Sequence, residues 1–130
     1  MKARSNGIIK ATPAADYSSH EGYGMTLAVA SNVLTATVSA SASVRIKGIV
    51  TEAGTVAQGV SLAVPGNCPG GVHVKLGGTV AAGAFIQQHT DGTFITDAET
   101  GARVIVGIAL EGGVAGDLVE ALLQTPVTLS

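Results

Sequence analysis

The chain has 130 residues, a net charge of −2, 12% charged residues and 3% aromatic residues. This length fits one domain. The charge balance argues against general nucleic-acid binding, which needs a basic surface, and a single cysteine, Cys68, excludes an intrachain disulfide. Low charge with few aromatic side chains indicates a protein that shares burial with neighbouring subunits or with a larger assembly.

The N-terminal segment mixes Gly, Pro, Ser and Asp with isolated tyrosines and shows no regular period. We therefore expect an irregular arm over residues 1–25 and a single β-rich domain over residues 26–130. The arm opens with the basic sequence MKARSNGIIK, which suits contact with a partner, and the alternative is a solvated, frayed terminus. The candidate contact residues are Lys2, Arg4, Ile8, Ile9 and Lys10.

From Met25 onward the sequence alternates with period two, which is typical of strands. The uncharged run 26–44 is long enough to span a bilayer, but recurrent Ser, Thr and Asn argue against a membrane helix, and we expect no membrane contact. Strand candidates are LAVAS, a long or once-broken strand over 33–51, and SLAVP. In VHVKLG the residues Val72, Val74 and Leu76 share one face.

The C-terminal half continues the pattern of short strands. AFIQQH and TFITDA flank the turn TDGT, where Asp91 and Gly92 give a strong hairpin signal. ARVIVGIAL predicts a buried strand, DLVEALL predicts a strand that could also be a helical turn, and residues 96–102 are equally a short helix or a loop. Many short strands with Gly-rich turns predict an all-β fold, either a sandwich or a barrel.

A glycine motif occurs three times, as GTVAQGVSL at 54–62, GTVAAGAFI at 78–86 and GGVAGDLVE at 112–120. In each copy a second glycine, Gly59, Gly83 or Gly116, precedes a strand and is expected to take positive φ in a turn. Phosphate-binding glycine loops open helices rather than strands, so a structural role is favoured for the three copies.

No residue pattern indicates a catalytic, metal or cofactor site. His89 and Asp91 are spaced for one face of a strand, but a third ligand is lacking and the turn explains Asp91 better. Cys68 lies five residues before His73, within the loop PGNCPGG, without the context of a nucleophile. We therefore expect a protein that is not an enzyme and that holds no metal or cofactor.

Three segments, MKAR, GTVAAGAFIQQHTDGTFIT and VIVGIALEGGVAGDLVEALL, resemble small capsid decoration (cement) proteins of tailed bacteriophages, with the match running from about Gly78 to Leu123. The resemblance implies a small β-sandwich or β-barrel (β-tulip-like) with an extended N-terminal arm. It also implies synthesis in the host cytoplasm, a place on the outer surface of the expanded head, a homotrimer, and contact with the major capsid protein and neighbouring copies. The tail QTPVTLS and the uncharged run 26–44 depart from that pattern.

Two other functions fit the same composition. The first is a tail, spike or adhesion component of a virion, which would differ in location and copy number. The second is a small β-barrel enzyme or ligand-binding domain, which would need a pocket with convergent polar groups. The sequence supplies few candidates for such a pocket.

Overall fold

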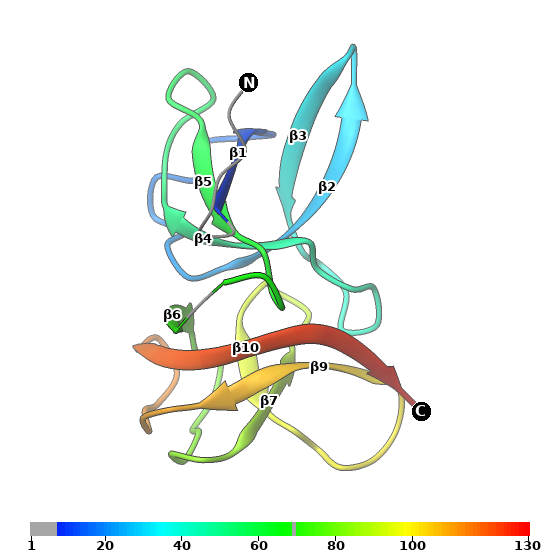
Figure 1. The fold of residues 1–130 in the computed structure, drawn as a ribbon, viewed down its shortest axis with the longest axis vertical. Helices are drawn as coiled ribbons and strands as arrows, with labels where there is room; N and C mark the ends of the chain where they lie inside the picture. Colours follow the sequence, from blue (N-terminus) through cyan, green and yellow to red (C-terminus); the bar gives the residue numbers. More distant parts are fainter. Residues whose placement is uncertain (1–7, 69) are drawn as a thin grey trace.

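The computed structural model describes residues 8–68 and 70–130, and these residues form ten strands and no helix. Five strands form a closed barrel in the order β1-β3-β2-β4-β5: β1 (Ile8–Pro13), β2 (Gly24–Ala30), β3 (Val33–Val38), β4 (Gly48–Glu52) and β5 (Val60–Ala63). The others form a sheet in the order β6-β10-β9-β7-β8: β6 (Gly71–Lys75), β7 (Phe85–Gln88), β8 (Phe94–Thr96), β9 (Arg103–Ala109) and β10 (Leu118–Leu129). Figure 1 shows the barrel above this second sheet. The predicted all-β fold is confirmed.

Strand β1 lies within the segment expected to be irregular. It pairs antiparallel with β5 from Ile8 to Ala11, and parallel with β3 only at Thr12 and Pro13. Ile8 packs against the core of the second sheet and Ile9 against the barrel core. Because the consecutive residues Ile8 and Ile9 both pack against a core, the local sequence lacks the apolar–polar alternation that would reveal the strand.

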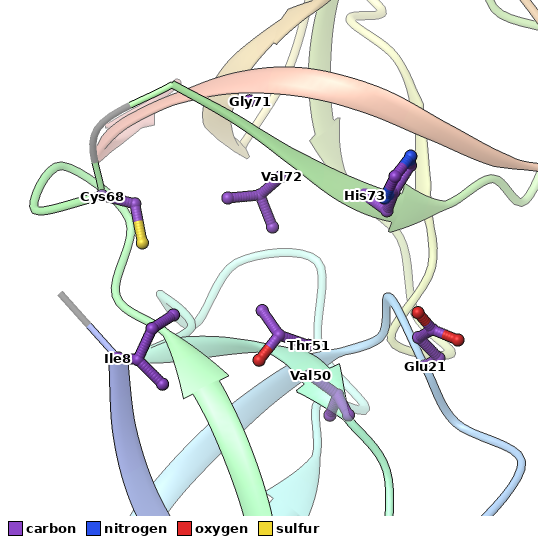
Figure 2. Close-up of a pocket in the computed structure, with 8 residues that line it drawn as sticks. All are labelled: Ile8, Glu21, Val50, Thr51, Cys68, Gly71, Val72 and His73. Carbon is purple, nitrogen blue, oxygen red and sulfur yellow. The ribbon is translucent and has the colours of Figure 1, made fainter. Parts of the chain in front are cut away.

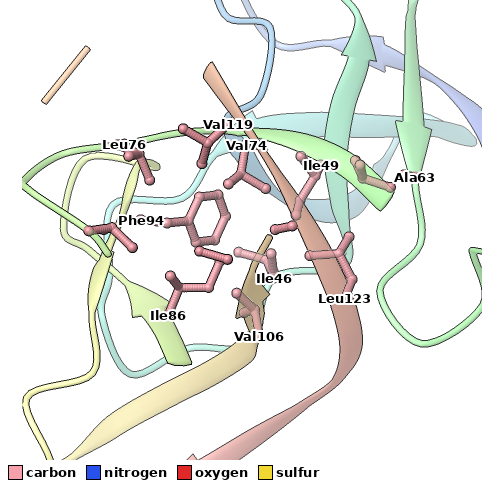
Figure 3. Close-up of a cluster of buried hydrophobic side chains, with 14 of the residues drawn as sticks. Ile46, Ile49, Ala63, Val74, Leu76, Ile86, Phe94, Val106, Val119 and Leu123 are labelled. Atoms are coloured by element: carbon pink, nitrogen blue, oxygen red, sulfur yellow. The ribbon is translucent and has the colours of Figure 1, made fainter. Parts of the chain in front are cut away.

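Strands β4 and β5 each contribute side chains to two hydrophobic cores, one in the barrel and one at the second sheet. In β4, Ile49 belongs to the core of the second sheet and Val50 to the barrel core. In β5, Ala63 belongs to the core of the second sheet and Leu62 to the barrel core. All four side chains are fully buried. Figure 3 shows Ile49 and Ala63 beside side chains of the second sheet around Phe94. The shared strands therefore join the barrel and the sheet through apolar packing rather than through a flexible linker.

The long run 33–51 is broken once, into β3 and β4, by a loop over residues 39–47. Ile46 of this loop is 2% exposed and belongs to the core of the second sheet. The side chain of Gln88, from β7, holds the loop: its Oε1 accepts the N–H of Ile46 at 2.9 Å, and its Nε2 donates to the carbonyl of Val44 at 2.7 Å. A buried amide thus replaces the ladder hydrogen bonds that the loop lacks.

Two copies of the glycine motif pair with each other. Val80 and Gly113 exchange both main-chain hydrogen bonds at 2.9 Å. The later glycines of the three motifs, Gly59, Gly83 and Gly116, have φ of 77°, 86° and 93° and precede β5, β7 and β10. Only glycine takes this conformation without steric cost, which explains the recurrence.

Two C-terminal segments that the sequence left open between two conformations form a strand and a loop. Except for its first residue, Asp117, the segment DLVEALL lies in strand β10, which pairs with β6 and β9. Residues 97–102 form a loop in which the Asp97 carboxylate accepts the N–H of Glu99 at 3.0 Å and pairs with Arg103. Glu99 has φ of 62°, which is incompatible with a helix.

Candidate functional site

The contact residues predicted in the N-terminal arm are only partly placed by the structure. Lys2 and Arg4 lie outside the described residues. Ile8 and Ile9 pack against the two cores, and Lys10 is exposed on β1 and pairs with Ser61 of β5. Residues 8–10 thus lie in a barrel strand rather than in an irregular arm, and the side chains of Ile8 and Ile9 are half-buried.

The turn between β7 and β8 is a compact polar feature built around the Asp91 carboxylate. The Asp91 carboxylate accepts the Thr93 N–H at 3.0 Å and the Thr93 hydroxyl, and Gly92 takes φ of 85°. Burial alone would raise the pKa of Asp91, but the two hydrogen bonds from Thr93 and the nearby His89 hold that pKa below its ordinary value. These contacts describe a turn stabilised by an aspartate rather than a metal ligand.

A cleft of about 270 Å³ lies where the barrel meets the second sheet. It contains Cys68, His73 and Glu21 as its reactive side chains, with Val50, Thr51 and Val72 along its wall. Figure 2 shows Cys68 at one end of this cleft and His73 and Glu21 at the other. A cysteine nucleophile needs its base within hydrogen-bonding reach, and the length of the cleft separates Cys68 from His73.

The three histidines occupy separate environments. The His20 ring contacts the rings of Tyr17 and Tyr23 in tilted arrangements, with centroid separations of 5.0 Å and 4.6 Å respectively. His73 is exposed on β6 opposite Glu120, and His89 lies beside the Asp91 turn. Within residues 8–68 and 70–130, no group of three His, Cys, Asp or Glu side chains is placed to hold a metal ion. The same residues contain no helix long and apolar enough to cross a membrane.

The most exposed apolar feature of the barrel is a hairpin arm, defined here as residues 26–34. It projects beyond the other barrel strands (Figure 1). Val29 is 72% exposed, and Val33 and Leu34 are 44% and 39% exposed. At the tip, Ser31 and Asn32 have φ of 51° and 66°, which is the geometry of a tight hairpin turn. The uncharged run in the sequence was the signal for this arm, although the run alone did not show that the arm projects.

A second apolar surface lies on the outer face of the second sheet. Leu122, Ile108 and Phe85 are neighbours across β10, β9 and β7. Leu122 and Phe85 are 48% and 50% exposed. Val127 and Leu129 extend the row and line a shallow hollow of about 250 Å³. Exposed apolar rows of this kind suit contact with another macromolecule.

No protein-family model and no curated protein sequence matches this chain. The fold is similar to the solved structure of the head fiber gp8.5 N base in bacteriophage phi29. The TM-score is 0.69, the sequence identity is 14%, and the similarity covers 95% of this chain and 97% of that chain. The two chains therefore share a fold over nearly their whole lengths.

Proposed function

We propose that this chain is a non-enzymatic structural protein of a bacteriophage virion that binds the outer surface of the head and cements its capsomers. The observation that carries the proposal is the end-to-end fold similarity to the base of a phage head fiber. The resemblance of residues 78–123 to capsid decoration proteins supports the same location from the sequence. In this role the partners are the major capsid protein and neighbouring copies of the chain.

The chemistry of the described surface supports a contact role. Exposed apolar rows lie on the hairpin arm and on the second sheet, as a contact surface requires. A cementing subunit stabilises the shell by bridging subunits that internal DNA pressure would separate. Many copies that each contribute a modest binding free energy can together resist that pressure, because attachment at several points amplifies weak contacts.

A second candidate function is a base that anchors a fibre or spike to the head. The similarity to the N base of a head fiber favours it specifically. The two roles differ in what the bound protein does: a cement raises the mechanical stability of the shell, whereas a fibre base leaves it unchanged and presents a further chain to the outside.

Add-back to heads that lack the protein tests both roles. Expanded heads from a deletion phage are mixed with purified chain, and bound copies and survival of osmotic shock are measured. The cement role predicts saturable binding and higher survival. Binding without a gain in survival favours the fibre base, and no binding at any site on the head would refute both roles.

A further inference from the structure

One edge of strand β2 has no neighbouring strand over most of its length. β2 pairs with β3 from Met25 to Ala30, but with β4 only at Gly24 and Met25. Figure 1 shows β2 as the outer strand of the hairpin arm, on the side away from β1 and β5. From residue 26 to residue 30 this outer edge is therefore free among the described residues.

The hydrogen-bonding direction of that edge follows from its last pairing. The Met25 carbonyl accepts the Lys47 N–H at 2.8 Å on the β4 side, while the Gly24 carbonyl accepts Ser39 N–H on the β3 side. Main-chain groups alternate in direction along a strand. Leu27 and Val29 thus present their N–H and C=O groups on the free edge.

This edge lacks the features by which proteins usually guard exposed strands. Natural edges carry Lys, Pro, bulges or inward charges that prevent pairing with another chain. The run from residue 26 to residue 43 contains no charged residue and no proline, and the register between β2 and β3 has no irregularity. A two-stranded hairpin on its own is marginal in water, so a further strand would stabilise the arm.

We propose that the free edge of β2 pairs with the same edge of a second copy of this chain, antiparallel about a two-fold axis at Ala28. The pairing places Leu27 opposite Val29 of the second copy and Ala28 opposite its counterpart. Each Leu27–Val29 pair exchanges two hydrogen bonds, and the Ala28 pair lies between them without hydrogen bonds. The result is a continuous four-stranded sheet, β3-β2 from each copy.

The charge pattern selects a second copy as the occupant. Each chain carries a net charge of −2, so a contact between two copies is favoured where charged side chains are absent. In a two-fold contact the residue on the axis lies opposite its own counterpart, and like charges directly opposite are destabilising. Residues 26–34 contain no charge to oppose. A partner recognised by its charge would find nothing complementary on this edge.

This inference names a partner surface for the self-contact in the proposed function, but it does not require the chain to lie on a phage head. Its stoichiometry differs from the homotrimer that the sequence resemblance implies. Solution mass distinguishes the two, and location in particles tests the proposed function separately.

The first experiment measures the mass of the full chain by sedimentation over a concentration series. The expected species is twice the 12.8 kDa chain. Ala28→Asp places two carboxylates opposite each other at the axis and is expected to raise the dissociation constant at least tenfold. Ala115→Asp introduces the same charge at another exposed alanine, in the turn before β10, and is expected to leave the dimer unchanged.

The second experiment maps the axis by crosslinking. In a Cys68→Ser background, Ala28→Cys is oxidised and compared with Ala115→Cys at equal concentration. A non-hydrogen-bonded antiparallel pair has Cα atoms about 4.5 Å apart, within the range of a disulfide. Ala28→Cys is expected to give a covalent dimer that Ala115→Cys does not give.

Several outcomes would overturn the two-fold pairing. These are a monomer throughout the concentration series, a group of three copies, a dimer that Ala28→Asp leaves intact, or equal crosslinking of the two cysteine variants. If the chain is monomeric but Ala28→Asp abolishes binding to heads, the edge pairs with a shell strand and the proposal is wrong. Dimerisation through Ala28 by a chain absent from particles would refute only the proposed function.

Discussion

Replacing Gln88 with methionine tests how the loop over residues 39–47 is held against the second sheet. Gln88 is 1% exposed, and its amide makes hydrogen bonds to Ile46 N, Val44 O and, at 3.3 Å, Ser41 O. Methionine preserves the length and apolar packing of the side chain but removes the three bonds. The buried N–H of Ile46 then loses its acceptor, while the carbonyls of Val44 and Ser41 lie in a more exposed part of the loop and can turn to water.

The magnitude follows from these partners. An unsatisfied buried donor costs about 1–3 kcal/mol, and loss of a partly exposed hydrogen bond costs about 0.5–1.5 kcal/mol. We therefore expect Gln88→Met to lower the free energy of unfolding by about 2–6 kcal/mol, a large part of the ~5–15 kcal/mol typical of a domain.

Urea denaturation measures the change, and hydrogen exchange at the Ile46 amide reports the loop locally. Gln124→Met is the matched control. Gln124 is half-buried on the outer face of the second sheet, and its side chain makes no hydrogen bond to the described residues. The control should stay within ~0.5 kcal/mol of the parent. A Gln88→Met protein as stable as the control, with unchanged exchange at Ile46, would show that the loop is held by apolar packing alone.

Two further predictions concern the turns. Gly83→Ala and Gly92→Ala both force alanine into positive φ, which costs about 1–2 kcal/mol, but a Cβ at Gly92 would lie 2.7 Å from Val38 whereas one at Gly83 meets nothing within 4 Å. Denaturation should therefore show a larger loss for Gly92→Ala, and equal losses would contradict the crowding at Val38. The pKa of Asp91 is lowered in the folded state, so its carboxylate stabilises the fold above the ordinary value of 3.8 and loses that effect as the pH falls through the lower folded pKa. Asp91→Asn should be less stable than the parent at pH 7, with the gap closing towards pH 2, and a gap independent of pH would refute the assignment.

Local patterns predicted those parts of the fold that depend on neighbouring residues. Val72, Val74 and Leu76 share a buried face as their alternation indicates, and the Asp91–Gly92 turn connects β7 and β8. Such features need only strand periodicity and the positive φ of glycine. The hairpin prediction at 84–98 is confirmed by the register of the two strands.

Features that depend on distant partners could not be predicted in this way. Strand β1 exists because Ile8 and Ile9 meet β5, more than fifty residues later, and Gln88 meets a loop some forty residues earlier. Neither pairing leaves a period in the sequence. The exposed hairpin arm lies within the uncharged run 26–44, but composition does not show which strand edge lacks a neighbour. The sequence thus marked the run as unusual, while the contact residues it predicted lie in the N-terminal segment instead.

The copy number of this chain in purified virus particles tests the proposed function most directly. Quantitative mass spectrometry of particles, with the major shell protein as the internal reference, gives the ratio of the two chains. A cementing protein on the head surface predicts a ratio approaching one to one. A handful of copies per particle would contradict the cementing role and favour an appendage, and absence from particles would contradict a virion role altogether.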